Sequence, residues 1–345
     1  MQKDIGSHAP CATSSARQGQ LKPTPKEVYI EPTNRCNELC LTCPRTFFQR
    51  EPEADLTYEA FVRILDQFPG VERVVLHGVG EPLLAHDLPG MVTEANRRGA
   101  RVLFNTNALA LHRRLAGQLI DAGLDELRVS MDAADQETYR AIRGVDGYAK
   151  AMRRTEDFCV HLRERGALRP RVSMFFMAMR ENLAQLPTVI EAAGAMGVGT
   201  VVLQRLVYFD LGLAVAGQSV MGDAGAEVDQ LLERCEEAAL RAGVELVGTG
   251  RRPAEQSLRP VDSRRPWSGC SRPWRSTYVT ANGNVLPCCI APFATEDYGG
   301  LILGNLFQRP ISEVWSGAEY ESFRRAHASD EPPEPCRGCG TRWMY

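Results

Sequence analysis

The sequence predicts an α/β fold in which repeated strand–helix units build a parallel sheet, followed by a small cysteine-rich module. Three observations lead to this prediction. Between residues 28 and 248, short runs rich in β-branched residues alternate with amphipathic segments, which is typical of strand–helix units. The composition then shifts toward Arg, Pro and Ser over residues 248–266. From residue 267 onward the chain contains five cysteines and several turns rich in Pro or Gly.

The strand–helix units can be assigned one by one. Between the first and second strand-like runs, apolar residues recur at helical spacing, namely Phe61, Ile64, Leu65 and Phe68. They place an apolar stripe on one side of a helix. A later helix is expected at residues 226–242, before a last short strand at 244–247. These stripes belong to the core. The six principal strands are expected at residues 28–31, 71–77, 101–105, 126–131, 171–177 and 200–206.

The same patterns divide the chain into four parts. Residues 1–25 are rich in Ser, Thr, Gln, Pro and Gly and are expected to form a flexible tail. Residues 26–248 hold the strand–helix units, and residues 249–266 are expected to be a linker. Residues 267–345 form the cysteine-rich module.

Composition and charge exclude several classes of function. The chain has 345 residues, of which 44% are hydrophobic, enough for a sizeable core. Forty basic and 43 acidic side chains give a formal charge of −3, which offers no general attraction to nucleic acid or to an anionic membrane. No signal peptide or apolar run of membrane-spanning length is evident, so a cytoplasmic location is expected. Without an export signal, the 11 cysteines favour metal ligation over disulfides.

Cys36, Cys40 and Cys43 form the first cysteine cluster, just after the strand expected at residues 28–31. Three close thiolates without a local fourth ligand suit a four-iron cluster in which one iron keeps an open coordination position. Structural zinc instead requires four ligands. A zinc site with a distant fourth ligand and buried thiols without metal are the alternatives.

The spacing Cys-x3-Cys-x2-Cys resembles that of the radical S-adenosylmethionine (SAM) enzymes. In that family three cysteines hold a [4Fe–4S] cluster and SAM binds the remaining iron. The resemblance implies a partial (β/α)6 barrel, similar to part of a TIM barrel, with its active residues at the carboxyl ends of the strands. Thr42 departs from the family, which usually has an aromatic or large apolar residue before the third cysteine. The packing of the adenine is therefore left open.

The resemblance also implies which residues contact SAM. The glycine-rich segment after the second strand resembles the one that holds the amino group of SAM, although a plain strand-to-helix turn has the same composition. Polar residues after the third and fourth strands match positions near the ribose or methionine part, and capping of turns or helices is their alternative role. The implied contacts are Gly78, Gly80, Glu81, Pro82, Asn105, Asn107, Ser130, Asp132, Arg143 for the SAM carboxylate and Gln204 on the adenine side. A solvated helix arginine is the alternative for Arg143.

Cys270, Cys288, Cys336 and Cys339 form a second set, and four thiolates can complete the coordination of a second [4Fe–4S] cluster. Their order resembles the auxiliary-cluster module called twitch, a shortened SPASM domain. One auxiliary cluster is therefore expected, with structural zinc as the alternative. Spacing does not decide between Cys288 and Cys289, but the preceding glycine pattern favours Cys288. Cys289 is then a candidate hydrogen-atom donor, or a thiol that simply packs in the interior.

The resemblance implies an enzyme that splits SAM and removes hydrogen from a substrate C–H bond. The cysteine pattern is similar to that of aminocyclitol-oxidising members of the family, so a sugar or aminocyclitol substrate is expected, changed by oxidation or epimerisation. An external one-electron reductant such as flavodoxin or ferredoxin is also expected. A peptide-modifying enzyme or maturase is the first alternative, and a non-catalytic iron–sulfur electron-transfer protein is the second.

Overall fold

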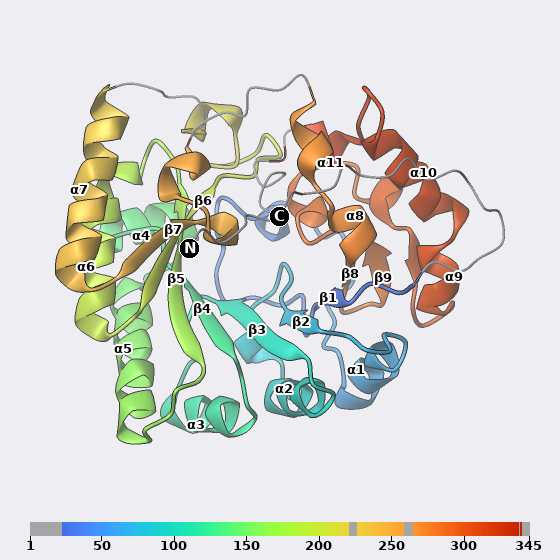
Figure 1. Ribbon diagram of the computed structural model, residues 1–345, viewed down its shortest axis with the longest axis horizontal. Helices are drawn as coiled ribbons and strands as arrows, with labels where there is room; N and C mark the ends of the chain where they lie inside the picture. Colours follow the sequence, from blue (N-terminus) through green and yellow to red (C-terminus); the bar gives the residue numbers. More distant parts are fainter. Residues whose placement is uncertain (1–22, 221–225, 259–264, 338, 340–345) are drawn as a thin grey trace, which may run out of the picture.

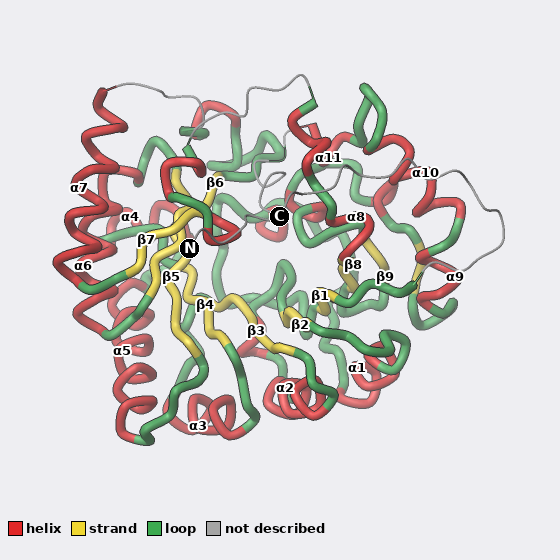
Figure 2. Tube along the Cα trace, viewed as in Figure 1, coloured by secondary structure: helices red, strands yellow, loops and turns green. Residues whose placement is uncertain are grey.

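A computed structural model describes residues 23–220, 226–258, 265–337 and 339. Its centre is one curved sheet of ten strands in the order β10-β9-β8-β1-β2-β3-β4-β5-β6-β7 (Figures 1 and 2). Strands β1 to β7 are mutually parallel and follow one another in chain order. The predicted α/β class with a partial barrel is confirmed.

The strands are β1 Glu27–Ile30, β2 Arg73–Leu76, β3 Arg101–Thr106, β4 Glu126–Ser130, β5 Arg171–Ala178, β6 Thr200–Arg205, β7 Glu245–Gly248, β8 Ser276–Val279, β9 Asn284–Leu286 and β10 Gly304–Asn305. The helices are α1 Tyr58–Leu65, α2 Leu88–Arg97, α3 Arg113–Asp121, α4 Gln136–Arg143, α5 Tyr148–Glu164, α6 Leu186–Met196, α7 Ala226–Ala242, α8 Arg272–Arg275, α9 Ile311–Trp315, α10 Ala318–His327 and α11 Glu334–Arg337. All six principal strands are present, and their bounds differ from the predicted ones by two residues at most.

The core lies between the sheet and the helices that cover its outer side. Strands β1 and β2 are buried at three successive residues each, which is the pattern of a parallel sheet covered on both faces. Helix α1 buries the predicted stripe of Phe61, Ile64 and Leu65, and Thr57 caps its first turn by accepting a hydrogen bond from the Ala60 amide. Figure 1 shows α2, α3 and α5 on the same outer side.

The cysteine-rich module joins the barrel through a strand pair that the sequence does not predict. Strand β8 pairs in parallel with β1, so that Glu27 lies opposite Ser276 and Ile30 opposite Val279. Strands β9 and β10 then extend the sheet in antiparallel fashion. The module is therefore a continuation of the barrel sheet beyond β1.

Part of the predicted linker packs against the barrel. At the end of β6, the Arg205 guanidinium donates to the carbonyls of Gln256 and Ser257. The Ser257 hydroxyl donates in turn to the carbonyl of Leu203 at 2.9 Å, and Ser257 is buried. Residues 249–258 thus form ordered turns beside β6 and β7, while 259–264 and the first 22 residues of the predicted tail lie outside the described residues.

No helix in the described ranges is both long and apolar enough to cross a lipid bilayer.

Gly144 ends helix α4 at a crowded position, and its replacement should be costly. Its φ is +71°, and a Cβ would lie 2.5 Å from the carbonyl oxygen of Leu39. We expect Gly144→Ala to lower the free energy of unfolding by roughly 2–4 kcal/mol, because left-handed strain and overpacking add. Gly99 is the matched control, with a φ of +80° and open space around it. Gly99→Ala should cost only about 1 kcal/mol. Urea unfolding of the two apo-proteins measures both, and equal losses would refute the steric argument.

Candidate functional site

The carboxyl ends of the strands surround a cavity of about 250 Å³, here called the central cavity. The loop after β1 and the loop after β2 form one side of it, and the ends of β3, β4 and β6 form the other. The structure thus brings together residues that are far apart in the sequence, as expected for a parallel barrel. The predicted site residues that line it are Cys36, Cys40, Cys43, Gly78, Gly80, Glu81, Asn105, Asn107, Ser130, Asp132, Arg143 and Gln204.

Pro82 is the one predicted SAM contact that does not line the central cavity. It is buried at the start of the short 3₁₀ turn Pro82–Leu84, where its fixed φ suits the first helical position. Its place is behind the cavity wall.

The cluster loop, residues 36–43, carries the first three cysteines into the cavity. Burial raises the pKa of Cys36 to about 11 and also raises the pKa of Cys40 and of Cys43. Binding of a metal cluster would compensate for the cost of ionising such buried thiols. Within the described ranges, no three His, Cys, Asp or Glu side chains converge closely enough to hold a single metal ion.

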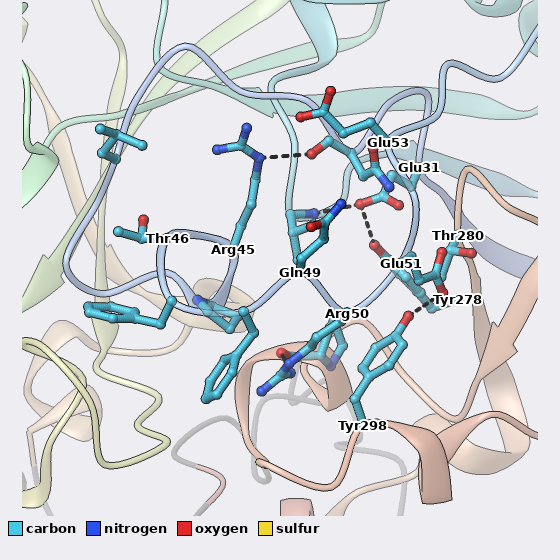
Figure 3. Close-up of a pocket in the computed structure, with 17 residues that line it drawn as sticks. Glu31, Arg45, Thr46, Gln49, Arg50, Glu51, Glu53, Tyr278, Thr280 and Tyr298 are labelled. Atoms are coloured by element: carbon cyan, nitrogen blue, oxygen red, sulfur yellow. Dashed lines mark hydrogen bonds between the residues drawn. The ribbon is translucent and has the colours of Figure 1, made fainter.

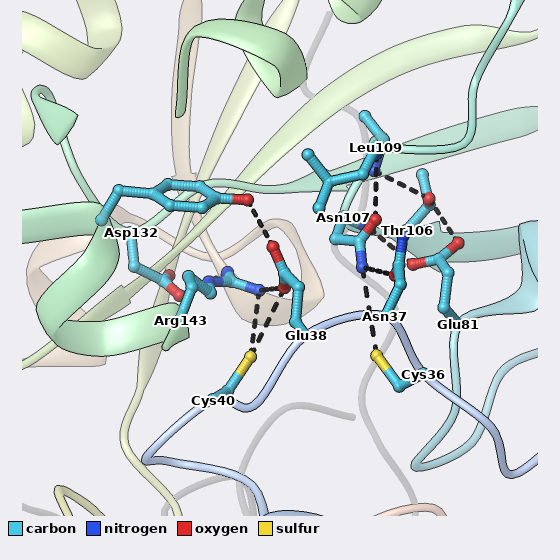
Figure 4. A network of polar contacts seen from close by, with 12 residues as sticks. Cys36, Asn37, Glu38, Cys40, Glu81, Thr106, Asn107, Leu109, Asp132 and Arg143 are labelled. Carbon is cyan, nitrogen blue, oxygen red and sulfur yellow. Dashed lines mark hydrogen bonds and ion pairs between the residues drawn. The ribbon is translucent and has the colours of Figure 1, made fainter. Parts of the chain in front are cut away.

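Two hydrogen-bond donors reach the sulfur atoms of this loop (Figure 4). Asn107 Nδ2 lies 4.0 Å from Cys36 Sγ, and Arg143 Nη1 lies 4.0 Å from Cys40 Sγ. Donors of this kind stabilise thiolate charge on an iron–sulfur cluster. The arrangement therefore fits a cluster at these three cysteines.

The glycine loop, residues 78–81, is glycine-rich because it lies directly against the chain that follows β1. A Cβ on Gly78 would lie 2.1 Å from Glu31 Oε1, and a Cβ on Gly80 would lie 2.1 Å from the carbonyl oxygen of Thr33. No side chain fits at either position without movement of the backbone or of Glu31. The sequence predicts that these glycines contact the amino group of SAM, and the structure adds this packing requirement.

Glu81 holds the end of β3 in place. Its carboxylate accepts hydrogen bonds from Thr106 Oγ1 at 2.6 Å, from the Asn107 amide at 2.7 Å and from the Leu83 amide at 3.0 Å. Burial raises its pKa to about 7 in spite of these bonds. Asn107 in turn donates from Nδ2 to Asn37 Oδ1 at 2.7 Å. Glu81 thus orients Asn107 toward the cluster loop.

Arg143, at the end of α4, lies at the centre of a buried ionic network (Figure 4). Its guanidinium donates to Asp132 and, at 3.4 Å, to Glu38. Burial works against its charge, but Asp132, Cys40 and Glu38 hold the pKa of Arg143 well above its ordinary value. Asp132 also accepts from the Met177 amide at 2.8 Å. Arg143 is therefore a buried link between β4 and the cluster loop, and the alternative of a solvated arginine is wrong.

Several residues of the central cavity are absent from the predicted contacts. Ile290 and Phe293 reach it from the cysteine-rich module, and Arg45, Phe175 and His77 line it from the barrel. Only His77 and Phe293 carry a signal in the sequence, one beside the glycine loop and the other among the aromatic residues of the module. Their rings stack with centroids 6.4 Å apart. Burial lowers the pKa of His77 to about 4, so it is neutral near pH 7.

The second set of cysteines also meets in one place. Cys270, Cys288, Cys336 and Cys339 line a small common cavity, which we call the auxiliary cavity. Burial raises the pKa of Cys288 and of Cys336 above their ordinary range. Cys288 thus faces the auxiliary cavity, and two residues further on Ile290 faces the central one.

Cys289 faces neither cavity. It is buried, and its side chain is hydrogen-bonded to Tyr29 of β1. This placement favours Cys288 as the ligand of the auxiliary cluster. The role of Cys289 as a hydrogen-atom donor to a substrate radical stays a prediction, and its side chain is not among those that line the central cavity.

A second cavity of about 400 Å³, here called the outer cavity, adjoins the central one (Figure 3). Arg45, Thr46 and Val79 line both. The outer cavity is polar on the side of Glu31, Glu51, Tyr278 and Tyr298, whereas Leu39 and Phe47 give it an apolar edge. Leu39 is 54% exposed and Phe47 is 37% exposed, which is unusual for such side chains.

Comparison with known proteins agrees with this geometry. The radical SAM superfamily matches residues 30–193, and SPASM, an iron–sulfur cluster-binding domain, matches residues 270–340. A PqqA peptide cyclase from Granulibacter bethesdensis is 25% identical over 319 residues, which covers 92% of this chain and 80% of the relative. A PqqA peptide cyclase from Streptomyces rochei is 28% identical over 323 residues, which covers 92% of this chain and 82% of the relative.

The fold is also similar to a solved structure. The crystal structure of Streptococcus suis SuiB bound to the precursor peptide SuiA matches with a TM-score of 0.67 and 16% identity, covering 94% of this chain and 71% of that one. At this level of identity the match concerns the fold alone.

These relatives overturn the expected substrate. The cysteine pattern favours a sugar or aminocyclitol that is oxidised or epimerised, but the relatives that align along the chain are named as peptide cyclases. The alternative of a peptide-modifying enzyme agrees with them better. The expectation of a sugar or aminocyclitol depends on the cysteine spacing. That spacing reports how the cluster module is held and carries no information about the substrate.

The expected cofactors are confirmed. The first domain implies a [4Fe–4S] cluster that binds SAM, and the second implies an auxiliary iron–sulfur cluster. The chain therefore contains a radical SAM domain, which is followed by an iron–sulfur cluster-binding SPASM domain.

Proposed function

We propose that this protein is a radical SAM enzyme that modifies a peptide. The observation that carries the proposal is the alignment of the peptide cyclase relatives over 92% of this chain, which includes the barrel and the cysteine-rich module together. A relative that shared the barrel alone would support only the chemistry of SAM. Agreement along both domains, and the outer cavity between them, supports a shared type of substrate.

When bound, the reduced cluster and SAM supply a one-electron cleavage that yields a 5′-deoxyadenosyl radical able to remove hydrogen from a C–H bond. Cys36, Cys40 and Cys43 would hold this cluster. Phe175, Ile290 and Phe293 give the central cavity apolar walls, which exclude water from a reactive species. The protein thus contributes ligands, orientation and a dry surrounding.

The outer cavity is the proposed place for the peptide. It adjoins the central cavity at Arg45, Thr46 and Val79, so a chain segment held there lies beside the SAM site. Leu39 and Phe47 offer apolar contacts at its edge, and Arg45 and Gln49 offer hydrogen-bond donors for backbone carbonyls. A peptide presents both kinds of group.

Four cysteines of the module would hold the auxiliary cluster. We propose Cys270, Cys288, Cys336 and Cys339 as its ligands, because all four line the auxiliary cavity. The segment from Cys288 to Phe293 connects this cavity with the central one, which suits transfer of an electron between the two. An external one-electron reductant, such as flavodoxin or ferredoxin, would supply the first electron.

The substrate class can be tested directly. The anaerobically reconstituted protein, with SAM and dithionite, is incubated with a synthetic peptide library and, in a parallel series, with sugars and aminocyclitols. We expect a peptide that loses two hydrogen atoms, detected by mass spectrometry, with formation of 5′-deoxyadenosine. Turnover of a sugar or aminocyclitol together with inert peptides would refute the proposal.

A further inference from the structure

We infer that Glu31 is a positioning residue for SAM, because its carboxylate fixes the glycine loop of the central cavity against the SPASM domain. This inference rests on the proposed function in one respect only, namely that SAM binds beside the glycine loop. It does not depend on the nature of the substrate.

Glu31 follows β1 directly and joins three parts of the molecule. Its Oε1 accepts hydrogen bonds from the Val79 amide at 2.7 Å and from the Tyr278 hydroxyl at 3.0 Å (Figure 3). Its Oε2 accepts from the Ala281 amide at 3.1 Å. Val79 belongs to the glycine loop, whereas Tyr278 and Ala281 belong to the SPASM domain. One carboxylate therefore connects the first strand, the glycine loop and the SPASM domain.

The environment shows that this connection is built into the interior. Glu31 is 2% exposed, and its hydrogen bonds come from neutral donors. The main chain reinforces the same junction, because the Glu31 amide donates to the Val279 carbonyl at 2.9 Å. Gly78 lies so close to the carboxylate that a Cβ there would be 2.1 Å from Oε1. The glycine loop thus rests on Glu31.

The glycine loop needs such a fixed point. Gly78 and Gly80 flank Val79, and glycine loses more conformational freedom than other residues when it is ordered. A loop held before SAM arrives costs less entropy on binding than a loop that SAM must order. Removal of the fixed point should therefore weaken SAM binding more than it slows the subsequent chemistry. Val79 lines both the central and the outer cavity, so the hydrogen bond between Glu31 and the Val79 amide fixes a residue that the two cavities share.

The variant Glu31→Gln tests this role with little change in shape. A glutamine has one acceptor oxygen and one donor NH₂ group, so it cannot accept from both Val79 and Ala281. A buried donor left unsatisfied is costly. We expect the dissociation constant of SAM, measured by equilibrium dialysis on cluster-loaded protein, to rise roughly tenfold to hundredfold. The kcat for 5′-deoxyadenosine formation at saturating SAM should stay within about threefold.

A second measurement uses the protein without cofactors. Hydrogen exchange of the segment that contains Val79 should accelerate by about tenfold or more in Glu31→Gln, because the glutamine either gives up the Val79 hydrogen bond or turns its NH₂ group against the Ala281 amide, and each outcome loosens the junction that holds the loop. Tyr278→Phe removes a single hydroxyl and should give the same changes at smaller size, which keeps the test available if the first variant folds poorly.

Asp125→Asn is the matched control. Asp125 is also a buried carboxylate that accepts from a backbone amide, that of Val102 at 2.8 Å, but it lies at the amino end of the sheet. This variant should leave SAM binding and the exchange of the glycine loop unchanged. Unchanged SAM binding and loop exchange in folded Glu31→Gln would overturn the inference, as would a loss of kcat without weaker binding. Failure of every peptide in the library would refute the proposed substrate while the effect on SAM remained.

Discussion

Replacement of Cys40 by alanine should abolish the cleavage of SAM. Its thiol lines the central cavity with those of Cys36 and Cys43, and a cluster with only two protein ligands lacks the defined open iron that SAM requires. We expect the rate of 5′-deoxyadenosine formation to fall by on the order of a thousandfold or more. Iron content should fall by about half, because the cysteines of the SPASM domain still hold their own cluster. Iron analysis and chromatography of the reaction mixture measure both.

Cys235→Ala is the control for this experiment. Cys235 is fully buried in α7, away from both sets of cysteines, so its loss should cost about 1 kcal/mol of stability. It should leave iron content and SAM cleavage unchanged. Full SAM cleavage by Cys40→Ala would contradict the assignment of the cluster ligands.

Replacement of Arg143 by methionine should have the largest effect on stability. The guanidinium is buried between the carboxylates of Asp132 and Glu38, and methionine of similar length leaves both without their cationic partner. Removal of one partner from a buried ionic group costs about 3–5 kcal/mol. We expect a loss of this size in the free energy of unfolding of the apo-protein, measured by urea denaturation monitored by circular dichroism.

Arg140→Met provides the comparison on the same helix. Arg140 pairs with Asp146 at the surface, where both side chains are more than half exposed. Exposed pairs contribute about 1 kcal/mol or less, so this variant should unfold close to the wild-type midpoint. Similar losses for Arg143→Met and Arg140→Met would show that the buried network does not hold α4 to the cluster loop.

Much of the barrel and its site follows from the sequence, because local patterns and parallel topology determine them. The strand that ends at Thr106 and the one that ends at Ser130 are recognisable as short β-branched runs. In a parallel sheet their carboxyl ends meet at one edge, so Asn107 and Asp132 could be expected near each other and near Cys36. The structure places all three on the central cavity.

Contacts between the two domains could not be predicted in this way. Glu31 meets Tyr278, and His77 meets Phe293, only because β8 pairs with β1. Nothing in the local sequence of either strand specifies that pairing. The choice between Cys288 and Cys289 is likewise a matter of which face of a short segment turns toward the auxiliary cavity, which spacing does not encode.

The error about the substrate has a similar cause. Cysteine spacing reports how a cluster is held, and the chemistry of the cluster is common to enzymes with many substrates. The surface proposed here for recognition is the outer cavity, whose wall combines Phe47 of the barrel with Tyr298 of the SPASM domain. That surface exists only after the two domains have come together.

Electron paramagnetic resonance of the reduced wild-type protein tests the central claim most directly. The protein is reconstituted without oxygen, and spectra are recorded with and without SAM. If SAM binds the open iron of the cluster held by Cys36, Cys40 and Cys43, its addition should shift the signal of that cluster, and the shift should be absent in Cys40→Ala. A fully loaded wild-type protein whose spectrum does not change at saturating SAM would contradict the account.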